Sequence, residues 1–217
     1  MAHYKLHCFA QSGNAYKIAL YLNCAGIDWE PVFVDFMKGG QTRDPDWRAE
    51  TNSMGEAPVL EIDGNKLTQT GAILIHLARE TGKFAPQGAE QDYEALRWIL
   101  FDNHKFTSFY ATHRFLYSLA PKPSSPDVMA FLRGRWEPAM KVVDAHLGDR
   151  QFMLGNDPTI ADFSFAGYMF YPKEESGFDI PAIAPNIAAW VERMRALDGW
   201  ADPYDLMPGD RVAPRQD

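Results

Sequence analysis

The sequence predicts an α/β domain followed by an all-α helical domain. The first 82 of the 217 residues alternate β-prone and helical patterns, whereas no convincing strand follows residue 92. Residues 83–92 contain Pro86 and Gly88 and are typical of a linker. We therefore expect one domain over residues 1–82 and a second over 93–217, which is an ordinary division for a chain of this length.

A β-α-β unit opens the chain. The β-prone segment 6–9 is followed by apolar residues at helical spacing, and Gly26 ends that helix. The alternating segment 29–36 then predicts a second strand. Because a helical crossover joins these two strands, we expect them to be parallel.

A hairpin and a helix complete the first domain, after a loop expected over residues 38–56. Asp63-Gly64 lies between the β-prone segments 58–62 and 66–68 and is a strong hairpin signal. A helical pattern follows and ends at Gly82. The order β-α-β-loop-β-β-α resembles the thioredoxin-like plan, which alone says little about function.

The second domain is expected to contain four main helices. Apolar periodicity predicts helices over 92–119, over 127–147, from Thr159 onward, and over 186–197. The Pro- and Ser-rich segment 120–126 separates the first two. The second domain is therefore all-α.

Composition excludes several classes of partner. The formal net charge is −8, and an acidic surface repels phosphate backbones, so we expect no nucleic-acid partner. No run of 18 apolar residues predicts a membrane span, and the N-terminus lacks the pattern of a signal peptide.

Cys8 and Cys24 lie among apolar residues, as buried free thiols do in a reducing cytoplasm. The six histidines show no metal-ligand spacing, so no metal site is expected.

Three motifs indicate a family. The segment 52–60, Asn-Ser-Met-Gly-Glu-Ala-Pro-Val-Leu, resembles the Asn-Pro-x-Gly-x-Val-Pro-x-Leu pattern of cytosolic glutathione S-transferases, with Ser53 and Ala57 as mild departures. Gln69-Thr70 matches the Glu/Gln-Ser pair of that family. Thr-x-x-Asp at residues 159–162 matches the capping box near the start of its core helix. The resemblance covers residues 4–200, about nine-tenths of the chain.

The resemblance implies how glutathione would be held as a co-substrate. In the family the proline matching Pro58 is cis, and the main chain of Ala57 pairs with the ligand as an added strand would. Glu56 would contribute its backbone. The helix start at Gln69-Thr70 would bind the γ-glutamyl end, Gln69 its amino group and Thr70 its carboxylate. The simpler alternatives are a trans Pro58 that opens a strand and a Thr70 that only caps the helix.

The segment 38–41, Lys-Gly-Gly-Gln, resembles the loop that reaches the glycyl carboxylate in several classes of the family. Lys38 or Gln41 would supply that contact. A solvated loop is an equally good interpretation of the same residues.

Ser12 lies where the family places the residue that bonds the glutathione sulfur. A free thiol has a pKa of about 8.5, and a hydroxyl donor at a helix N-terminus favours the thiolate. Asn14 is a competing donor, because bacterial members with a Ser-and-Asn turn share this duty between the two residues. Alternatively, Ser12 only forms the turn and Asn14 only caps the helix.

A mostly aromatic face is expected on the first helix of the second domain. Asn103, Phe106, Thr107 and Tyr110 follow the spacing i, i+3, i+4 and i+7. In the family the matching face holds a hydrophobic electrophile. Such a stripe is also typical of plain helical core, so both interpretations stay open.

The resemblance thus predicts a homodimeric glutathione transferase that adds the glutathione thiolate to a hydrophobic electrophile, with glutathione-dependent disulfide reduction as an additional activity. A non-catalytic protein-binding module of the same fold is one alternative. A dedicated catabolic lyase or dehalogenase is another. The sequence does not identify the electrophile, the class within the family, or the main thiolate donor.

Overall fold

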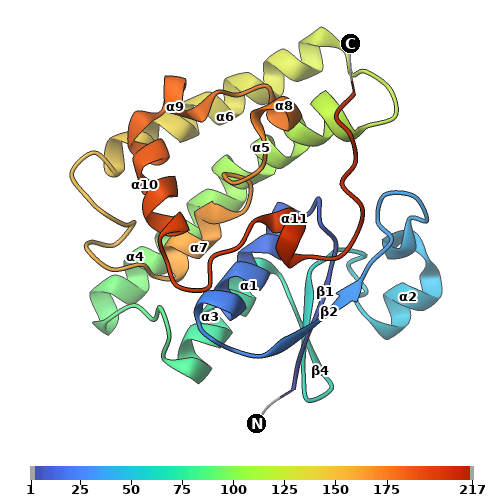
Figure 1. Ribbon diagram of the computed structural model, residues 1–217, viewed down its shortest axis with the longest axis horizontal. Helices are drawn as coiled ribbons and strands as arrows, with labels where there is room; N and C mark the ends of the chain where they lie inside the picture. Colours follow the sequence, from blue (N-terminus) through green and yellow to red (C-terminus); the bar gives the residue numbers. More distant parts are fainter. Residues whose placement is uncertain (1–2, 216–217) are drawn as a thin grey trace. The chain divides into compact units, whose positions relative to one another are not determined.

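The computed structural model describes residues 3–215, which form two compact units (Figure 1). The first unit runs to Ala85 and also includes Asp198–Arg211, whereas the second runs from Pro86 to Leu197 and resumes at Val212. The sequence placed all of 93–217 in the helical domain. The structure differs because main-chain carbonyls of Asp198–Arg211 accept hydrogen bonds from the first unit.

A four-stranded mixed sheet is the centre of the first unit. Its order is β2 (Trp29–Phe33), β1 (Tyr4–Cys8), β3 (Val59–Ile62), β4 (Asn65–Thr68). Strands β1 and β2 are parallel, and β3 pairs antiparallel with both β1 and β4, which confirms the expected β-α-β unit and hairpin. Asp63 and Gly64 both have positive φ, as the tight hairpin turn requires.

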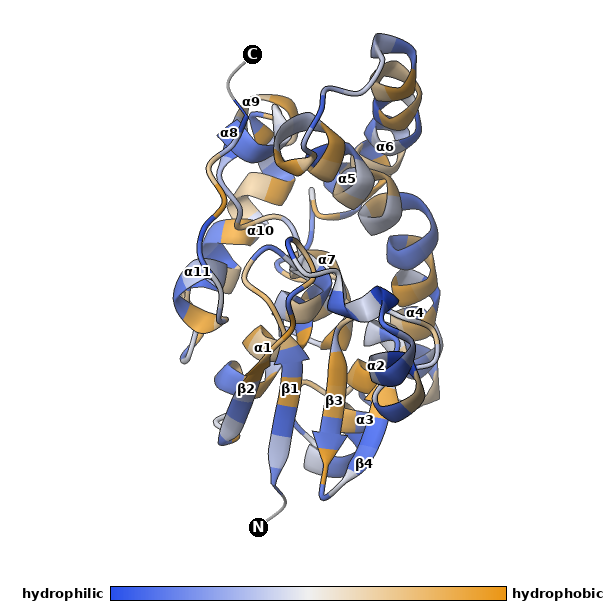
Figure 2. Ribbon diagram, turned by 90° about the vertical axis from the view of Figure 1, so that its right-hand side faces the viewer, coloured by the Kyte–Doolittle hydropathy of each residue, from blue (hydrophilic) through white to orange (hydrophobic). Residues whose placement is uncertain are grey.

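Helices cover both faces of this sheet. Figure 1 shows α1 (Gly13–Cys24) and α3 (Thr70–Thr81) on one side and α2 (Pro45–Glu50) on the other. Gly26 and Gly82 adopt left-handed backbone after α1 and α3, so both predicted helix ends are confirmed. Val59 and Leu60 of β3 point to opposite faces and are both buried, and Figure 2 shows hydrophobic residues (orange) over much of this strand.

The expected loop over 38–56 is partly helical. It contains the 3₁₀ turn η1 (Gln41–Arg43) and α2, whose Trp47 packs with Phe9 and Val59. The side chain of Asp44 accepts hydrogen bonds from the backbone N–H groups of Asp46 and Trp47, with proline at the first helical position. This Asp-Pro pair is a helix-start signal, but the helix is too short for an apolar periodicity to reveal it.

The second unit begins with a continuous helical run. It consists of α4 (Gly88–Phe101), the π-helical η2 (Asp102–Phe106), α5 (Thr107–Arg114) and the π-helical η3 (Phe115–Leu119). The helix expected over 92–119 is therefore confirmed, although it starts earlier and includes the last residues of the expected linker. The π segments have i→i+5 turns, which change the face that later side chains occupy.

The remaining predicted helices are also present. They are α6 (Pro126–His146), α7 (Ile160–Ala166) and α10 (Pro185–Arg195). The short helices α8 (Lys173–Ser176), α9 (Ile180–Ile183) and α11 (Pro203–Leu206) were not expected. None of the helices between residues 3 and 215 is both long and apolar enough to cross a membrane.

Asp162 completes the capping box that the sequence predicted over residues 159–162, and it is fully buried. Its carboxylate accepts hydrogen bonds from the backbone N–H groups of Thr159 (2.9 Å) and Met153 (2.8 Å), and from the indole N–H of Trp190 (2.9 Å). Burial raises the pKa of Asp162 to about 6. Since the carboxylate joins α7, α10 and the preceding loop, it has a structural role in the second unit.

Gln69, at the N-cap of α3, has an unusual backbone conformation. Its φ is 66° and its ψ is 108°, a region that residues with a side chain rarely occupy. The residue is exposed, so its strain is not required by core packing. Strain of this kind concentrates at functional positions.

We therefore expect Gln69→Gly to be more stable than Gln69→Ala by about 1 kcal/mol, because glycine relieves the strain while both variants lose the same side chain. Urea unfolding at equilibrium measures the difference. Glu80, which is exposed near the end of the same helix, provides the control: there the alanine variant should be the more stable one, by about 1 kcal/mol. If the alanine variant were the more stable one at position 69 as well as at position 80, the backbone of Gln69 would not be strained.

Candidate functional site

The sheet register brings the predicted binding segments to one end of the first unit. His7 of β1 lies opposite Val59 of β3, and Val59 lies opposite Thr68 of β4. Strand β1 ends one residue after His7, β3 begins at Val59, and β4 ends at Thr68, so these three strand ends lie in one row across the sheet. The segments that adjoin this row are therefore neighbours; they are the turn at 9–12, the Ala57–Pro58 bond and the start of α3.

Ser12 is the N-cap of α1 and is buried. Its Oγ accepts a hydrogen bond from the backbone N–H of Ala15 at 3.1 Å, and its own N–H donates to the Phe9 carbonyl at 3.0 Å. The capping interaction uses only a lone pair of Oγ. Among the described residues none accepts the hydroxyl proton, so this proton can be donated to a sulfur anion beside the helix N-terminus.

Asn14, in the first turn of α1, has a buried side-chain oxygen with no hydrogen-bond partner among residues 3–215. A buried amide without a partner costs free energy unless a ligand or water supplies the missing bond. Asn14 does not cap the helix, because Ser12 occupies that position. Ser12 therefore has an unused hydrogen-bond donor, whereas the unpartnered group of Asn14 is an oxygen, which accepts hydrogen bonds and cannot itself donate to a sulfur anion.

The Ala57–Pro58 peptide bond is cis, as the resemblance implied. The preceding loop is fixed by Asn52, whose amide donates to the Glu56 carbonyl at 2.8 Å and accepts from the Met54 N–H at 3.0 Å. Within the described chain, the main-chain N–H and C=O of Ala57 have no hydrogen-bond partner. An extended peptide can pair with them as an additional strand would.

Gln69 and Glu56 are linked, since Gln69 Nε2 donates to Glu56 Oε2 at 2.8 Å. The Glu56 carbonyl accepts from Asn52, and the Glu56 carboxylate, although bonded to Gln69, has lone pairs for a further donor. Thr70 is buried as the first residue of α3, and the N-cap is Gln69. The interpretation of Thr70 as the cap residue is therefore wrong, and the N-terminus of this 12-residue helix suits a carboxylate.

Gln41 has a clear structural role. Its side-chain oxygen accepts from the Asp35 N–H at 2.9 Å, and its own N–H donates to the Asp35 carbonyl at 2.8 Å. Lys38 is exposed, and its backbone N–H donates to the Asp35 carboxylate at 3.0 Å. The Lys38 ammonium group and the Gln41 NH₂ group remain the parts that would reach a glycyl carboxylate.

The expected electrophile face is not a surface. Phe106 packs between Trp136 and Phe165, with ring centroids 5.9 Å and 5.1 Å away. Tyr110 likewise contacts Trp136, at 4.9 Å. Thr107 donates to buried Asp102 at 2.6 Å.

These three side chains belong to the core of the second unit, so the structure supports the core interpretation of Phe106, Thr107 and Tyr110. Only Asn103 of the four is partly exposed. The prediction assumed 3.6 residues per turn, whereas Asn103 and Phe106 lie in the π-helical segment η2.

The cysteines do not provide a nucleophile. Burial raises the pKa values of Cys8 and Cys24 to about 12, so both thiols are protonated at neutral pH. In the described part of the chain, no group of three or more His, Cys, Asp or Glu residues could hold a metal ion. A reactive thiolate would therefore have to come from a ligand.

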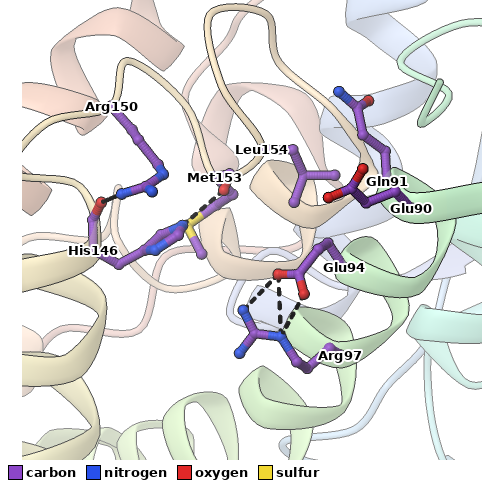
Figure 3. Close-up of a pocket in the computed structure, with 8 residues that line it drawn as sticks. All are labelled: Glu90, Gln91, Glu94, Arg97, His146, Arg150, Met153 and Leu154. Atoms are coloured by element: carbon purple, nitrogen blue, oxygen red, sulfur yellow. Dashed lines mark hydrogen bonds and ion pairs between the residues drawn. The ribbon is translucent and has the colours of Figure 1, made fainter. Parts of the chain in front are cut away.

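A pocket of about 510 Å³ lies in the second unit, and Figure 3 shows Glu94 and Arg97 turned toward one another at its edge. Arg97 pairs with Glu94, and Arg150 donates to the His146 carbonyl at 3.1 Å. The His146 Nε2 bonds the Met153 carbonyl at 2.8 Å, and burial lowers the pKa of this imidazole. None of the predicted site residues lines this pocket, so it is not the site considered above.

Sequence reasoning missed two features of the site. The first is the Glu56 carboxylate, whose contact with Gln69 joins residues 13 positions apart. The second is the C-terminal segment Asp198–Arg211, which reaches the turn before α1. Neither has a local signal, because both depend on contacts between distant parts of the chain.

Comparisons with known proteins agree with this geometry. Residues 3–79 match the family model for the glutathione S-transferase N-terminal domain, and residues 126–193 match the model for the C-terminal domain. A crystal structure of a possible glutathione S-transferase from Rhodopseudomonas palustris is similar, with a TM-score of 0.82 and 29% identity, over 93% of this chain and 98% of that one.

Two curated relatives cover most of the chain. The hematopoietic prostaglandin D synthase of Gallus gallus is 30% identical over 89% of this chain and 97% of its own length. The disulfide-bond oxidoreductase YfcG of Escherichia coli is 26% identical over 87% of this chain and 88% of its own. With both domain models matched and similarity along nearly the whole length of these proteins, the chain belongs to the glutathione S-transferase family.

Proposed function

We propose that the protein binds glutathione and transfers its thiolate sulfur to a hydrophobic electrophile. The observation that carries this proposal is the meeting, at one end of the sheet, of three groups with unused hydrogen-bonding capacity. These are the Ser12 hydroxyl, the main chain of Ala57 and the N-terminus of α3. Each suits a different part of glutathione.

The tripeptide would lie along the open edge beside Pro58. The cysteinyl main chain pairs with the N–H and C=O of Ala57, while the γ-glutamyl carboxylate binds at Thr70 and the N-terminus of α3. The γ-glutamyl ammonium group lies near Gln69 and the Glu56 carboxylate, which are already hydrogen-bonded to each other. Lys38 or Gln41 contacts the glycyl carboxylate.

Ser12 would stabilise the anionic sulfur. A hydrogen bond to a charged group contributes about 1.5–3 kcal/mol, which corresponds to about one to two pKa units. The bound thiol would then titrate near neutral pH, so thiolate would be a major species. The thiolate attacks the electrophilic carbon, a C–S bond forms, and the leaving group departs with its bonding electrons.

Reduction of disulfides by glutathione is the second candidate activity. The observation in its favour is the similarity to the protein named disulfide-bond oxidoreductase YfcG. The same bound thiolate would attack a disulfide sulfur, forming a mixed disulfide and expelling the other sulfur as thiolate. Cys8 and Cys24 would take no part, and these free thiols also suit the cytoplasm as the location of the protein.

The thiolate donor can be identified from the pH dependence of thiolate absorbance at saturating glutathione. We expect Ser12→Ala to raise the pKa of the bound thiol by about one to two units, and Asn14→Ala to raise it less. A Ser12→Thr variant keeps the hydroxyl and should retain most of the effect. If neither alanine variant changes the pKa, the sulfur is not held by this turn.

Activity assays would separate the alternatives in the same preparations. Turnover of an aryl halide supports the transferase, and turnover of a mixed disulfide of glutathione supports the reductase. Glutathione binding without turnover of either class would indicate a non-catalytic binding module. Turnover confined to one ether or alkyl halide would indicate a dedicated lyase or dehalogenase.

We also propose that the protein is a homodimer. Tyr93, Leu96 and Leu100 follow helical spacing on α4, and their exposed fractions are 65%, 44% and 61%. A stripe of large apolar side chains on a helix surface is typical of an interface with a partner. A second copy of the chain would cover it.

Sedimentation equilibrium should therefore give the mass of two chains for the wild type and of one chain for Leu100→Glu, because a buried unpaired carboxylate disfavours association. Val128→Glu, at an apolar residue on α6 with 41% exposure, is the matched control and should remain dimeric. A dimeric Leu100→Glu variant would place the interface elsewhere.

A further inference from the structure

The segment Asp198–Arg211, here called the C-terminal strap, runs along α1 in the first unit (Figure 1). Its main-chain carbonyls accept hydrogen bonds from α1 and from the turn before it. The Gly199 carbonyl accepts from Asn23 Nδ2, and the Ala201 carbonyl accepts from the Tyr16 hydroxyl. Further along the strap, the Pro208 carbonyl accepts from the Ala10 N–H, and the Asp210 carbonyl accepts from Gln11 Nε2. The strap thus runs antiparallel to α1, from its C-terminal end to the turn at its N-terminal end.

The last two of these bonds are made to the residues that immediately precede Ser12. The Ala10 N–H donates to the Pro208 carbonyl at 2.8 Å, and Gln11 is buried with an exposed fraction of 6%. Within the turn itself, the Ser12 N–H makes one backbone bond, to Phe9. The strap therefore contributes two hydrogen bonds to this turn, one to the Ala10 main chain and one to the Gln11 side chain.

The strap is held firmly at this point. Met207 is buried, and Gly209 has a φ of 113°, which side-chain-bearing residues rarely adopt. A Cβ at Gly209 would lie 3.0 Å from the Phe33 ring and 3.7 Å from the Ala10 nitrogen. The backbone conformation and the nearby Phe33 ring therefore favour glycine at this position, and the Ala10 nitrogen of the turn lies at ordinary contact distance.

We propose that Gln11 and the strap residues Pro208–Asp210 position the Ser12 hydroxyl, and so set the strength of its hydrogen bond to the glutathione sulfur. This inference rests on the proposed function. Gln11 is a positioning residue in it, since it contacts the strap and acts through Ser12. A hydrogen bond to a charged sulfur weakens steeply when its donor is misaligned, so a small movement of the turn is sufficient.

The proposal separates sulfur activation from tripeptide binding. The strap carbonyls accept hydrogen bonds from α1 and from the turn before it, whereas the proposed tripeptide contacts at Ala57, Gln69 and Thr70 lie just before β3 and at the start of α3. Loosening the strap should therefore change the thiol while leaving the affinity for glutathione nearly unchanged. A general loss of structure would change both.

Two variants test the proposal by different routes. Gln11→Met removes the side-chain donor while keeping the side chain's size, and Gly209→Ala displaces the strap without changing residues 10–12. For both we expect a rise of about 0.5–1 unit in the pKa of the bound thiol, or about three- to tenfold less thiolate below that pKa. The value of kcat should fall by a similar factor, and the glutathione Kd should change less than about twofold. Asp205→Ala, an exposed change within the strap, is the control and should match the wild type.

Hydrogen exchange of the ligand-free protein gives a readout that does not need glutathione. Backbone amides over residues 9–16 should exchange faster in Gln11→Met and Gly209→Ala than in the wild type or in Asp205→Ala. If the wild type bound no glutathione, the proposed function would fail, and exchange alone would decide whether the strap orders the turn. In that case, unchanged hydrogen exchange in both variants would overturn the inference. If the wild type does bind glutathione, an unchanged pKa of the bound thiol in both variants would overturn it.

Discussion

The register of the central sheet is the constraint on which the site depends. Pairing of His7 with Val59, and of Val59 with Thr68, brings three chain segments to one end of the sheet. A shift of one residue in this pairing would turn each side chain to the other face and separate those segments. The buried Val59 and Leu60, which point to opposite faces, oppose such a shift because each is packed on its own side of the sheet.

Local geometry, rather than net charge, suits this acidic protein to an anionic tripeptide. The chain carries a formal charge of −8, so its overall field would repel carboxylates. The N-termini of α1 and α3 instead present the backbone N–H groups of their first turns at short range, where the positive end of each helix dipole is strongest. The strained backbone of Gln69 at the start of α3 fits this arrangement, since a less strained cap would direct the chain differently.

Local signals in the sequence predicted most of the fold, and the family motif predicted the cis bond at Pro58. Gly26, Gly82 and Asp63-Gly64 mark their turns because each needs a backbone conformation that few residues adopt. Phe106, Thr107 and Tyr110 share one face as their spacing predicted, and this face is core, because periodicity identifies a buried face but not what covers it. The return of Asp198–Arg211 to the first unit depends on contacts with residues far away in sequence, for which no local pattern exists.

The most direct measurement is a calorimetric titration with glutathione and with cysteinylglycine, the dipeptide that lacks the γ-glutamyl residue. A site formed jointly by the edge at Ala57 and the start of α3 should bind glutathione with a Kd below about 1 mM. It should bind the dipeptide at least about tenfold more weakly, a difference of about 1.4 kcal/mol, because the carboxylate for α3 is missing. No heat of binding with millimolar glutathione, or equal affinity for the two peptides, would contradict the account.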